Sequence, residues 1–600
     1  MKKTVKQISV LIISMSLAVS VQAKDRIIVN PAYEFSASGI TYVTKIELGE
    51  NETRLHIHTI FIPGWWVKFI ATAYIEDCAT GIKWQTTGII NGEFDKQIPM
   101  PKSGDSTFIL VFPALPESVT KINFCNNDDP ITIFGISLNP KTKQRSTEIP
   151  ASVNKWIDRE LSKAKRKKLM NFKSGEFFSK DSARLIGYIN GYDPRAGFST
   201  GIVYAGNELT GEDYPIVIKI HEDGRFEGTI PMNYPENMSV NFQNHNVNFY
   251  IQPGQTLAMM LDWNDFLMAD RKRNIRYEFS NTRFQGPTAG INQELTAFKL
   301  KLPELYSKEI YGEMQKKDVD EYKSFLNTIT ADYTSKYNQL LSEEKLSPQA
   351  RKILQDKYKM QFVSFLMEYE MSYGYSRENK KLPADFYSIL QDIPMNDKEM
   401  LSTENFNVFI NRFEYCSPFR IIVDKRIFPK KTTVEYLFDE LGLEKTAEDL
   451  RYFAKRDSVS IIFNNKDITQ EDQQKWMMDY QEESKSFMKR YESKLSDYNE
   501  KYLKPIRQLQ NQIMADEWRA KDSVYQNVLK LSPGIVYDIT KVRALNFIFT
   551  ERMQGNKEDS KKYLDGLLSD IREPFLKEEA KRIYNKNFPA DLKKILEKEK

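Results

Sequence analysis

Residues 54–66 read RLHIHTIFIPGWW, and this stretch decides the fold of the N-terminal region. Apolar and polar side chains alternate from Leu55 onward, which is the two-residue period of a strand with one buried face. His56 and His58 therefore lie on the same side of that strand, where both imidazoles could reach one cation. The stretch predicts a β-strand, and it poses the question of whether His56-x-His58 belongs to a metal site or simply to a folding module.

Further short strands are expected on both sides of this one, between residues 24 and 142. Segments such as TYVTKIEL, VKFIATAYI, STFILVF and ITIFGISL are rich in β-branched and aromatic residues, and turn-forming stretches such as GENE, NGEFD and KSGD separate them. No segment with helical periodicity interrupts the series. Short strands at this spacing predict a β-sandwich over residues 24–142.

The next two regions differ from each other in charge and periodicity. Residues 143–182 combine one helical pattern with five basic residues among the six from Lys163 to Lys168. We interpret them as a basic helical linker whose charges face solvent, and binding to an anionic membrane surface is the alternative. Over residues 183–286, alternating strands with an Asp-Gly turn in HEDGRF and a Pro-Gly turn in IQPGQT predict a second β-sandwich-like domain.

Helical patterns dominate residues 287–600, so the whole chain is expected to be a multidomain α+β protein. The clearest helix begins at Thr469, where Asp472 three residues later completes a capping pattern, and Pro505 marks a stop or a kink. Such a helix would either pack within the domain or meet a partner helix. Residues at a spacing of three and four form a stripe on one face of it: Met477, Tyr480, Ser484, Phe487, Tyr491, Leu495, Tyr498 and Tyr502.

The N-terminal residues indicate where the protein is located in the cell, and the overall charge limits the classes of partner it can bind. Residues 1–23 have a basic start, an apolar core and a small-residue VQA site ending at Ala23, which predicts a secretory signal peptide and a periplasmic protein. No later run approaches the roughly 20 apolar residues of a membrane span. The formal net charge of +4 over 600 residues leaves no basic footprint of the kind that nucleic-acid binding requires.

Histidine is scarce in the chain, which bears on the metal question. Besides His56 and His58 there are only His221 and His245, and both lie in the second predicted β-domain. A metal site needs three or four ligands, and no carboxylate stands at a diagnostic spacing. A structural or surface role for the pair is favoured over metal binding, and no cofactor is expected.

Cysteine is scarce as well, although export permits disulfides. Only Cys78, Cys125 and Cys416 are present, too few for a disulfide framework. Cys78 and Cys125 lie in one predicted domain and can pair, or all three can be buried thiols that behave as small apolar side chains. Because no C-x-x-C occurs, no dithiol redox centre is encoded.

One short motif suggests a catalytic serine. GFSTG, residues 197–201, matches the G-x-S-x-G nucleophile elbow around Ser199. That elbow works on a strand-to-helix turn, whereas a strand is expected after Ser199. No catalytic residue is therefore assigned.

The chain resembles the exported, multidomain TlpA-like thioredoxin-family proteins of Gram-negative bacteria. The resemblance rests on TYVTKIELGENETRLHIHTIFIPGWWVKFI in the first β-domain, on IHEDGRFEGTIPM and FYIQPGQTLAMMLDW in the second, and on RFQGPTAGINQEL before the helical region. It implies two β-domains and a helical spacer that normally precede a thioredoxin domain with a W-C-x-x-C site. That site is absent here, so no catalytic cysteine is carried over.

These observations lead to one expected function and one alternative. The expected function is that of a non-catalytic periplasmic binding or interaction protein, whose partner is another exported protein or a thioredoxin-like domain. The alternative is a component of a thiol–disulfide oxidoreductase whose thioredoxin domain is lost or supplied in trans. A reactive thiol of low pKa would favour the alternative.

Overall fold

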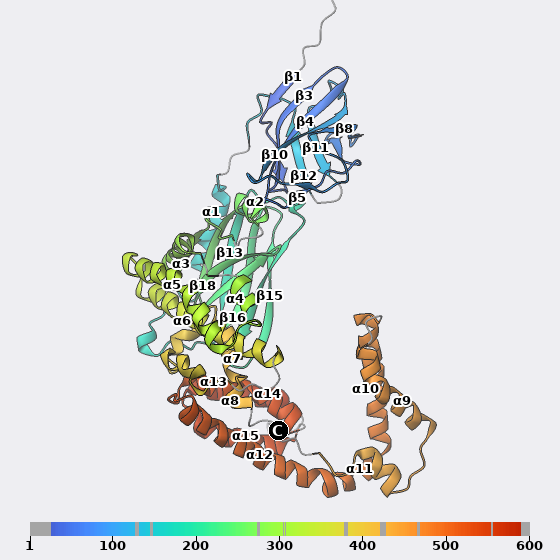
Figure 1. Ribbon diagram of the computed structural model, residues 1–600, viewed down its shortest axis with the longest axis vertical. Helices are drawn as coiled ribbons and strands as arrows, with labels where there is room; N and C mark the ends of the chain where they lie inside the picture. Colours follow the sequence, from blue (N-terminus) through green and yellow to red (C-terminus); the bar gives the residue numbers. More distant parts are fainter. Residues whose placement is uncertain are drawn as a thin grey trace, which may run out of the picture.

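The computed structural model divides the chain into two β-rich parts and a helical part (Figure 1). The expected mixed α+β class is confirmed. The expected signal peptide, residues 1–23, lies outside the described residues. The structure describes residues 26–126, 131–144, 148–272, 277–303, 305, 308–376, 382–420, 428–464, 468–553 and 556–589.

The first β-domain is a sandwich of two five-stranded sheets, as its strand pattern predicts. Leu55 and Ile57 are fully buried between the sheets, and they pair across strands with Leu110 and Phe108. One sheet has the order β1 (Arg26–Val29), β3 (Thr41–Leu48), β4 (Glu52–Ile60), β10 (Asp105–Pro113), β8 (Gly88–Ile90). The other has the order β2 (Phe35–Ser36), β12 (Ile131–Ser137), β11 (Lys121–Asn126), β6 (Tyr74–Asp77), β7 (Lys83–Gln85). A separate ribbon pairs β5 (Trp66–Val67) with β9 (Ile98–Pro99).

The second β-domain differs from the expected second sandwich, because it is a single eight-stranded sheet. Inward side chains from all eight strands form one apolar cluster, so the sheet curls around its own core. Among the described strands of this sheet, only β13 and β19 pair in parallel. The strand order is β18 (His245–Ile251), β17 (Glu236–Phe242), β14 (Thr200–Asn207), β15 (Glu212–Ile220), β16 (Arg225–Met232), β13 (Asp181–Asn190), β19 (Thr256–Asp262), β20 (Arg283–Gln285).

Helices cover this sheet from outside and at its edges. Helix α3 (Ala289–Lys301) contacts both edge strands, β18 and β20. Helix α2 (Trp263–Arg271) adds Trp263 and Phe266 to the apolar core of the sheet. Trp263 Nε1 also donates a hydrogen bond to the carbonyl of Ser36, which ties the two β-domains together.

The expected basic linker is part of the second domain. Helix α1 (Ala151–Ser162) packs Trp156 and Ile157 against Ile186 and Ala258 on the outer face of the sheet. An amphipathic helix beside an exposed apolar sheet face buries that face, which the linker interpretation did not anticipate. Most of the basic run after α1 is solvent-exposed, and Lys165 and Arg166 form ion pairs with Asp181 and Glu176 of the same domain.

The helical part begins beside the sheet and extends into a projecting arm. Helices α5 (Val319–Glu343), α6 (Pro348–Ser376), α7 (Phe406–Glu414), α8 (Ser417–Arg420), α13 (Ile535–Arg543), α14 (Leu545–Phe547), α15 (Lys557–Asp570) and α16 (Pro574–Asn587) form its body. The arm, which stands away from the body in Figure 1, contains α9 (Ala447–Asn464), α10 (Gln470–Arg490) and α11 (Glu492–Tyr498). Helix α12 (Lys504–Ser523) returns from the arm to the body. In the described part of the chain, the structure has no helix long and apolar enough to span a membrane.

The expected long helix is broken, although it begins as predicted. The Thr469 side chain accepts a hydrogen bond from the Asp472 backbone N–H, which caps α10. Helix α10 ends at Arg490, and α11 is followed by a π-helical turn, η6 (Asn499–Leu503). Pro505 stands in the first turn of α12, directly after this π-helical turn, so the position predicted for a stop or a kink falls at the junction of η6 and α12.

The aromatic stripe of α10 and α11 packs inside the arm. Tyr480 and Phe487 stack on Tyr452 of α9, with ring centroids 6.0 and 4.6 Å apart. Tyr498 packs on Tyr436, with ring centroids 5.2 Å apart. The stripe is expected either to pack within the domain or to meet a partner helix. From Tyr480 to Tyr502, the structure shows packing within the domain.

Candidate functional site

His56 and His58 lie on the outer face of strand β4, on the same side, as their spacing predicts. Each meets a different carboxylate: His56 Nε2 lies 3.2 Å from Glu47, and His58 Nε2 lies 2.8 Å from Asp105. Burial, followed by the charge of Lys45, lowers the pKa of His56. Among the described residues, no group of three or more potential ligands converges on a metal site. The two histidines form separate surface pairs.

The three cysteines are free thiols in different environments: Cys78 is exposed, Cys125 is half-buried and Cys416 is buried. Cys125 lies opposite Tyr74 in the β11–β6 ladder, and Cys78 follows Asp77 at the far end of the same ladder. Four residues along a strand span about 13 Å, beyond the roughly 7 Å between Cα atoms that a disulfide tolerates. The considered Cys78–Cys125 disulfide therefore does not form.

Neither Cys78 nor Cys416 has the character of a catalytic thiol. Burial, followed by the negative charge of Glu34, raises the pKa of Cys78. Burial likewise raises the pKa of the fully enclosed Cys416 thiol. A catalytic cysteine needs the opposite shift, toward the thiolate at neutral pH.

Ser199 lacks the geometry of a nucleophile elbow. It stands directly before strand β14, and its carbonyl accepts a hydrogen bond from the Ile220 N–H. The connection that holds Ser199 leads from β13 to β14, which are not neighbours in the sheet, and strand β14 follows the serine directly, where an elbow would have a helix. An elbow requires a helix at that point.

The best-formed cavity lies between the second β-domain and the helical body. Its volume is about 590 Å³, within the range that holds small organic ligands. One wall is the β14–β15 turn, with Thr210, Gly211 and Glu212. The remaining walls come from α7, α8, α12, α13 and α14, so the cavity exists only where the sheet and the helical body meet.

Aromatic side chains form the apolar lining of this cavity. Tyr537 is buried beneath Phe419 and Trp518, with ring centroids 6.4 and 6.3 Å away. The Tyr537 hydroxyl donates to Asp522 at 2.8 Å, and Trp518 Nε1 donates to the Tyr563 hydroxyl, which fixes both rings. Met514 and Ile548 complete the apolar surface. The rings are held in place and present a preformed surface.

Arg543 joins the sheet to the helical body at the wall of the cavity. Its guanidinium donates to both oxygens of Glu414 at 2.9 and 3.1 Å, and to the backbone carbonyl of Glu208 at 3.0 Å. Burial raises the pKa of Glu414 and of Glu208, although the charge of Arg543 acts in the opposite direction. A buried, bidentate arginine of this kind fixes the relative position of the elements it joins.

Glu212 makes a second link between the turn and the helical body. It accepts from Lys586 at 2.7 Å, and it also pairs with Arg582 of α16. Although burial acts to raise it, the hydrogen bonds from these two cations lower the pKa of Glu212 to about 2. The carboxylate is therefore charged at neutral pH, and it holds the cavity wall against α16.

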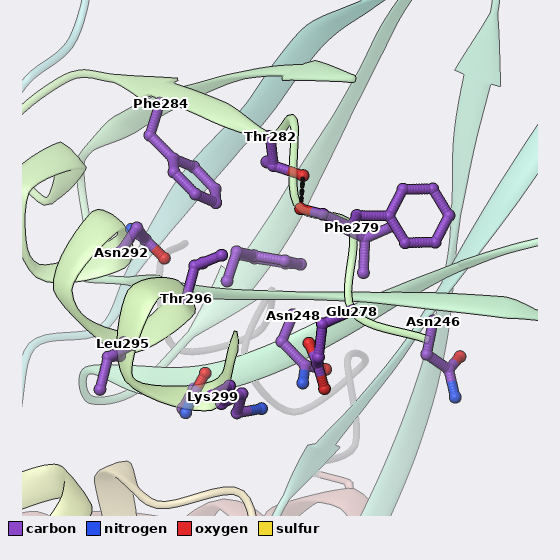
Figure 2. A pocket seen from close by; sticks show the side chains of 13 residues that line it. Asn246, Asn248, Glu278, Phe279, Thr282, Phe284, Asn292, Leu295, Thr296 and Lys299 are labelled. Carbon is purple, nitrogen blue, oxygen red and sulfur yellow. Dashed lines mark hydrogen bonds between the residues drawn. The ribbon is translucent and has the colours of Figure 1, made fainter. Parts of the chain in front are cut away.

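A second depression lies at the seam of the curled sheet, but it is much smaller. Figure 2 shows Asn246 and Asn248 of β18 on one side, Thr296 and Lys299 of α3 on another, and the segment around Phe279 above them. Its volume is about 20 Å³, which is room for one water molecule. It is a packing seam and is too small for an organic ligand.

No protein-family model, curated protein or solved structure matches this chain. Function is therefore inferred from the geometry of the chain's own residues. The sequence patterns did not indicate any residue of the large cavity, because its walls come from segments around 210, 417, 518 and 544 that are distant in the chain. One local sequence feature points to the cavity: an aromatic residue, Trp518, stands three positions before a cation, Lys521, on α12. The same spacing is common on ordinary amphipathic helices.

Proposed function

We propose that this chain is a non-catalytic, exported binding protein, and that the cavity between the curled sheet and the helical body is its ligand site. The observation that carries the proposal is the cavity itself: about 590 Å³ in volume, lined by fixed aromatic rings and walled by both parts of the chain. The raised pKa values of Cys78 and Cys416 support a role without thiol chemistry. Periplasmic location and correspondence to the ancillary part of a TlpA-like protein belong to the same proposal, supported by residues 1–23 and by the resemblance of the β-domains.

The test is binding of a neutral fluorescent probe, N-phenyl-1-naphthylamine, to purified residues 24–600. We expect saturable binding at one site. Ala544→Trp should abolish it, because Ala544 lines the cavity and an indole there would fill the space. Ala454→Trp is the matched control, because Ala454 is exposed on helix α9 of the arm.

Two results would contradict the proposal. Probe binding that survives Ala544→Trp unchanged would place the ligand elsewhere. Reduction of insulin disulfides by the purified protein at thioredoxin-like rates would show that the chain is an enzyme.

A further inference from the structure

The acids and the cations that line the cavity of about 590 Å³ differ in how much of their hydrogen-bonding capacity the protein itself uses. Four lining residues are cationic and three are acidic. Each of the three acids already has a cation of the protein as its partner: Glu212 has Lys586, Glu414 has Arg543, and Glu517 has Lys521 at 3.1 Å. Each acid of the lining is therefore already paired with a cation before any ligand enters.

The donors are in excess by comparison. Arg420 has five N–H groups, and among the described residues one of them is used, at 3.2 Å from Glu370. Lys521 has three N–H groups, and one oxygen of Glu517 pairs with it. A ligand with negatively charged oxygens can accept these remaining donors, whereas a cationic ligand would have to displace Lys521 from Glu517 or Arg543 from Glu414.

Two cations stand against the aromatic lining: Lys521, which lines the cavity, and Lys541, which does not. Lys521 Nζ lies 4.7 Å from the Trp518 ring centroid, and Lys541 Nζ lies 4.9 Å from that of Tyr537. An apolar body that packs on these rings would therefore bring its substituents close to positive charge. Charge-assisted hydrogen bonds of arginine to anionic oxygens are short and strong, and they gain strength where water is excluded.

We propose that the cavity selects an organic anion, a small molecule whose apolar body packs on Trp518 and Phe419 and whose anionic group pairs with Arg420 and Lys521. This rests on the proposed function, since it names the class of ligand for the same cavity. The anionic group accepts hydrogen bonds that the protein's own acids leave unused.

The test compares two probes with the same aromatic body on purified residues 24–600. One is 8-anilinonaphthalene-1-sulfonate, which is anionic, and the other is N-phenyl-1-naphthylamine, which lacks the sulfonate. We expect the anionic probe to bind about tenfold more tightly, the factor that one charge-assisted hydrogen bond supplies. Arg420→Gln and Lys521→Met should each remove most of that preference, measured for each variant as the ratio of its affinities for the two probes.

The matched control is Arg519→Gln, because Arg519 is an exposed cation of the same helix that pairs with Asp516 and does not line the cavity. It should leave both affinities unchanged, and the thermal midpoint of each variant shows that it is folded. Equal affinity for the two probes, or a preference that survives both substitutions, would overturn the inference while the proposed function stands. Failure of both probes to bind would overturn the proposed function itself.

Discussion

The side chain of Asn292 pairs with the backbone of Tyr250 as a neighbouring strand would. Its Oδ1 accepts from the Tyr250 N–H at 2.6 Å, and its Nδ2 donates to the Tyr250 carbonyl at 2.8 Å. Both residues are buried, and Asn292 belongs to α3, whereas Tyr250 belongs to the edge strand β18. One amide group thus pairs both backbone groups of a residue on an edge strand, and unpaired groups of this kind are a template for association.

Asn292→Ala should loosen this edge. Two buried backbone groups would lose their partner, at a cost of roughly 2–4 kcal/mol in the free energy of unfolding. Amide exchange at Tyr250 should accelerate in the intact protein, and the thermal midpoint should fall. Gln293→Ala is the control, because Gln293 is exposed on the same helix. Unchanged protection at Tyr250 would show that the amide pairing does not stabilise the edge.

Glu236 should make stability depend on pH. Burial, followed by the negative charge of Glu208, raises the pKa of Glu236 well above its ordinary value. The folded state then holds a proton that the unfolded state releases, so stability is highest below the unfolded pKa of about 4.3 and falls as the pH rises toward the folded pKa. Glu236→Gln should remove this loss and raise the thermal midpoint at pH 8 by about 2–4 °C.

The same substitution should have little effect at pH 4, where the glutamate is largely protonated in both states. Glu222→Gln is the control for the loss of one negative charge, because Glu222 is exposed on the same sheet domain. An equal rise of the midpoint at both pH values would indicate a packing effect and would rule out titration of Glu236 as the cause.

Thiol labelling should follow burial and pKa. Iodoacetamide should modify the exposed Cys78 slowly at pH 7 and faster as the pH rises, because the pKa of this thiol is raised. Cys416 should react only after denaturation, since it is enclosed in the helical core. Cys78→Ser should remove the labelling of this exposed site. Rapid labelling of any thiol at pH 6 in the folded protein would favour the oxidoreductase alternative.

Asp449 should hold helices α9 and α10 of the arm together. Its buried carboxylate accepts from Arg490 and from the Tyr491 hydroxyl, each at 2.7 Å. Burial acts to raise its pKa, but these hydrogen bonds lower it overall, so its contribution is present at neutral pH and is lost as the pH falls through the folded pKa. Asp449→Asn should weaken the arm by about 1.5–3 kcal/mol.

Limited proteolysis of the intact protein measures this effect, because an opened arm is cleaved at α9 and α10 before the body. Asp457→Asn is the control, since Asp457 is exposed on the same helix and pairs with Arg456. Equal cleavage of the two variants would show that Asp449 has no special role in closing the arm.

Local patterns predicted what depends on local physics. The alternation around Leu55 and Ile57 placed both side chains in the sandwich core, and Thr469 caps α10 as its spacing with Asp472 indicates. Packing across the chain was not predictable in this way. The sequence of α1 does not reveal which sheet buries Trp156, and nothing near Arg543 shows that Glu414 and Glu208 will accept its hydrogen bonds.

The pairing of α3 with β18 also determines how far a fragment containing the second domain must extend. The sequence predicts an end of this domain near residue 286, after the last strand, but Asn292, which pairs both backbone groups of Tyr250 on β18, lies beyond that point. A fragment that ends at residue 286 would leave the backbone groups of Tyr250 without Asn292 and should associate through this strand edge, whereas one that continues to Lys301 retains the pairing. During synthesis, the edge of β18 can gain this pairing only after α3 has been added to the chain.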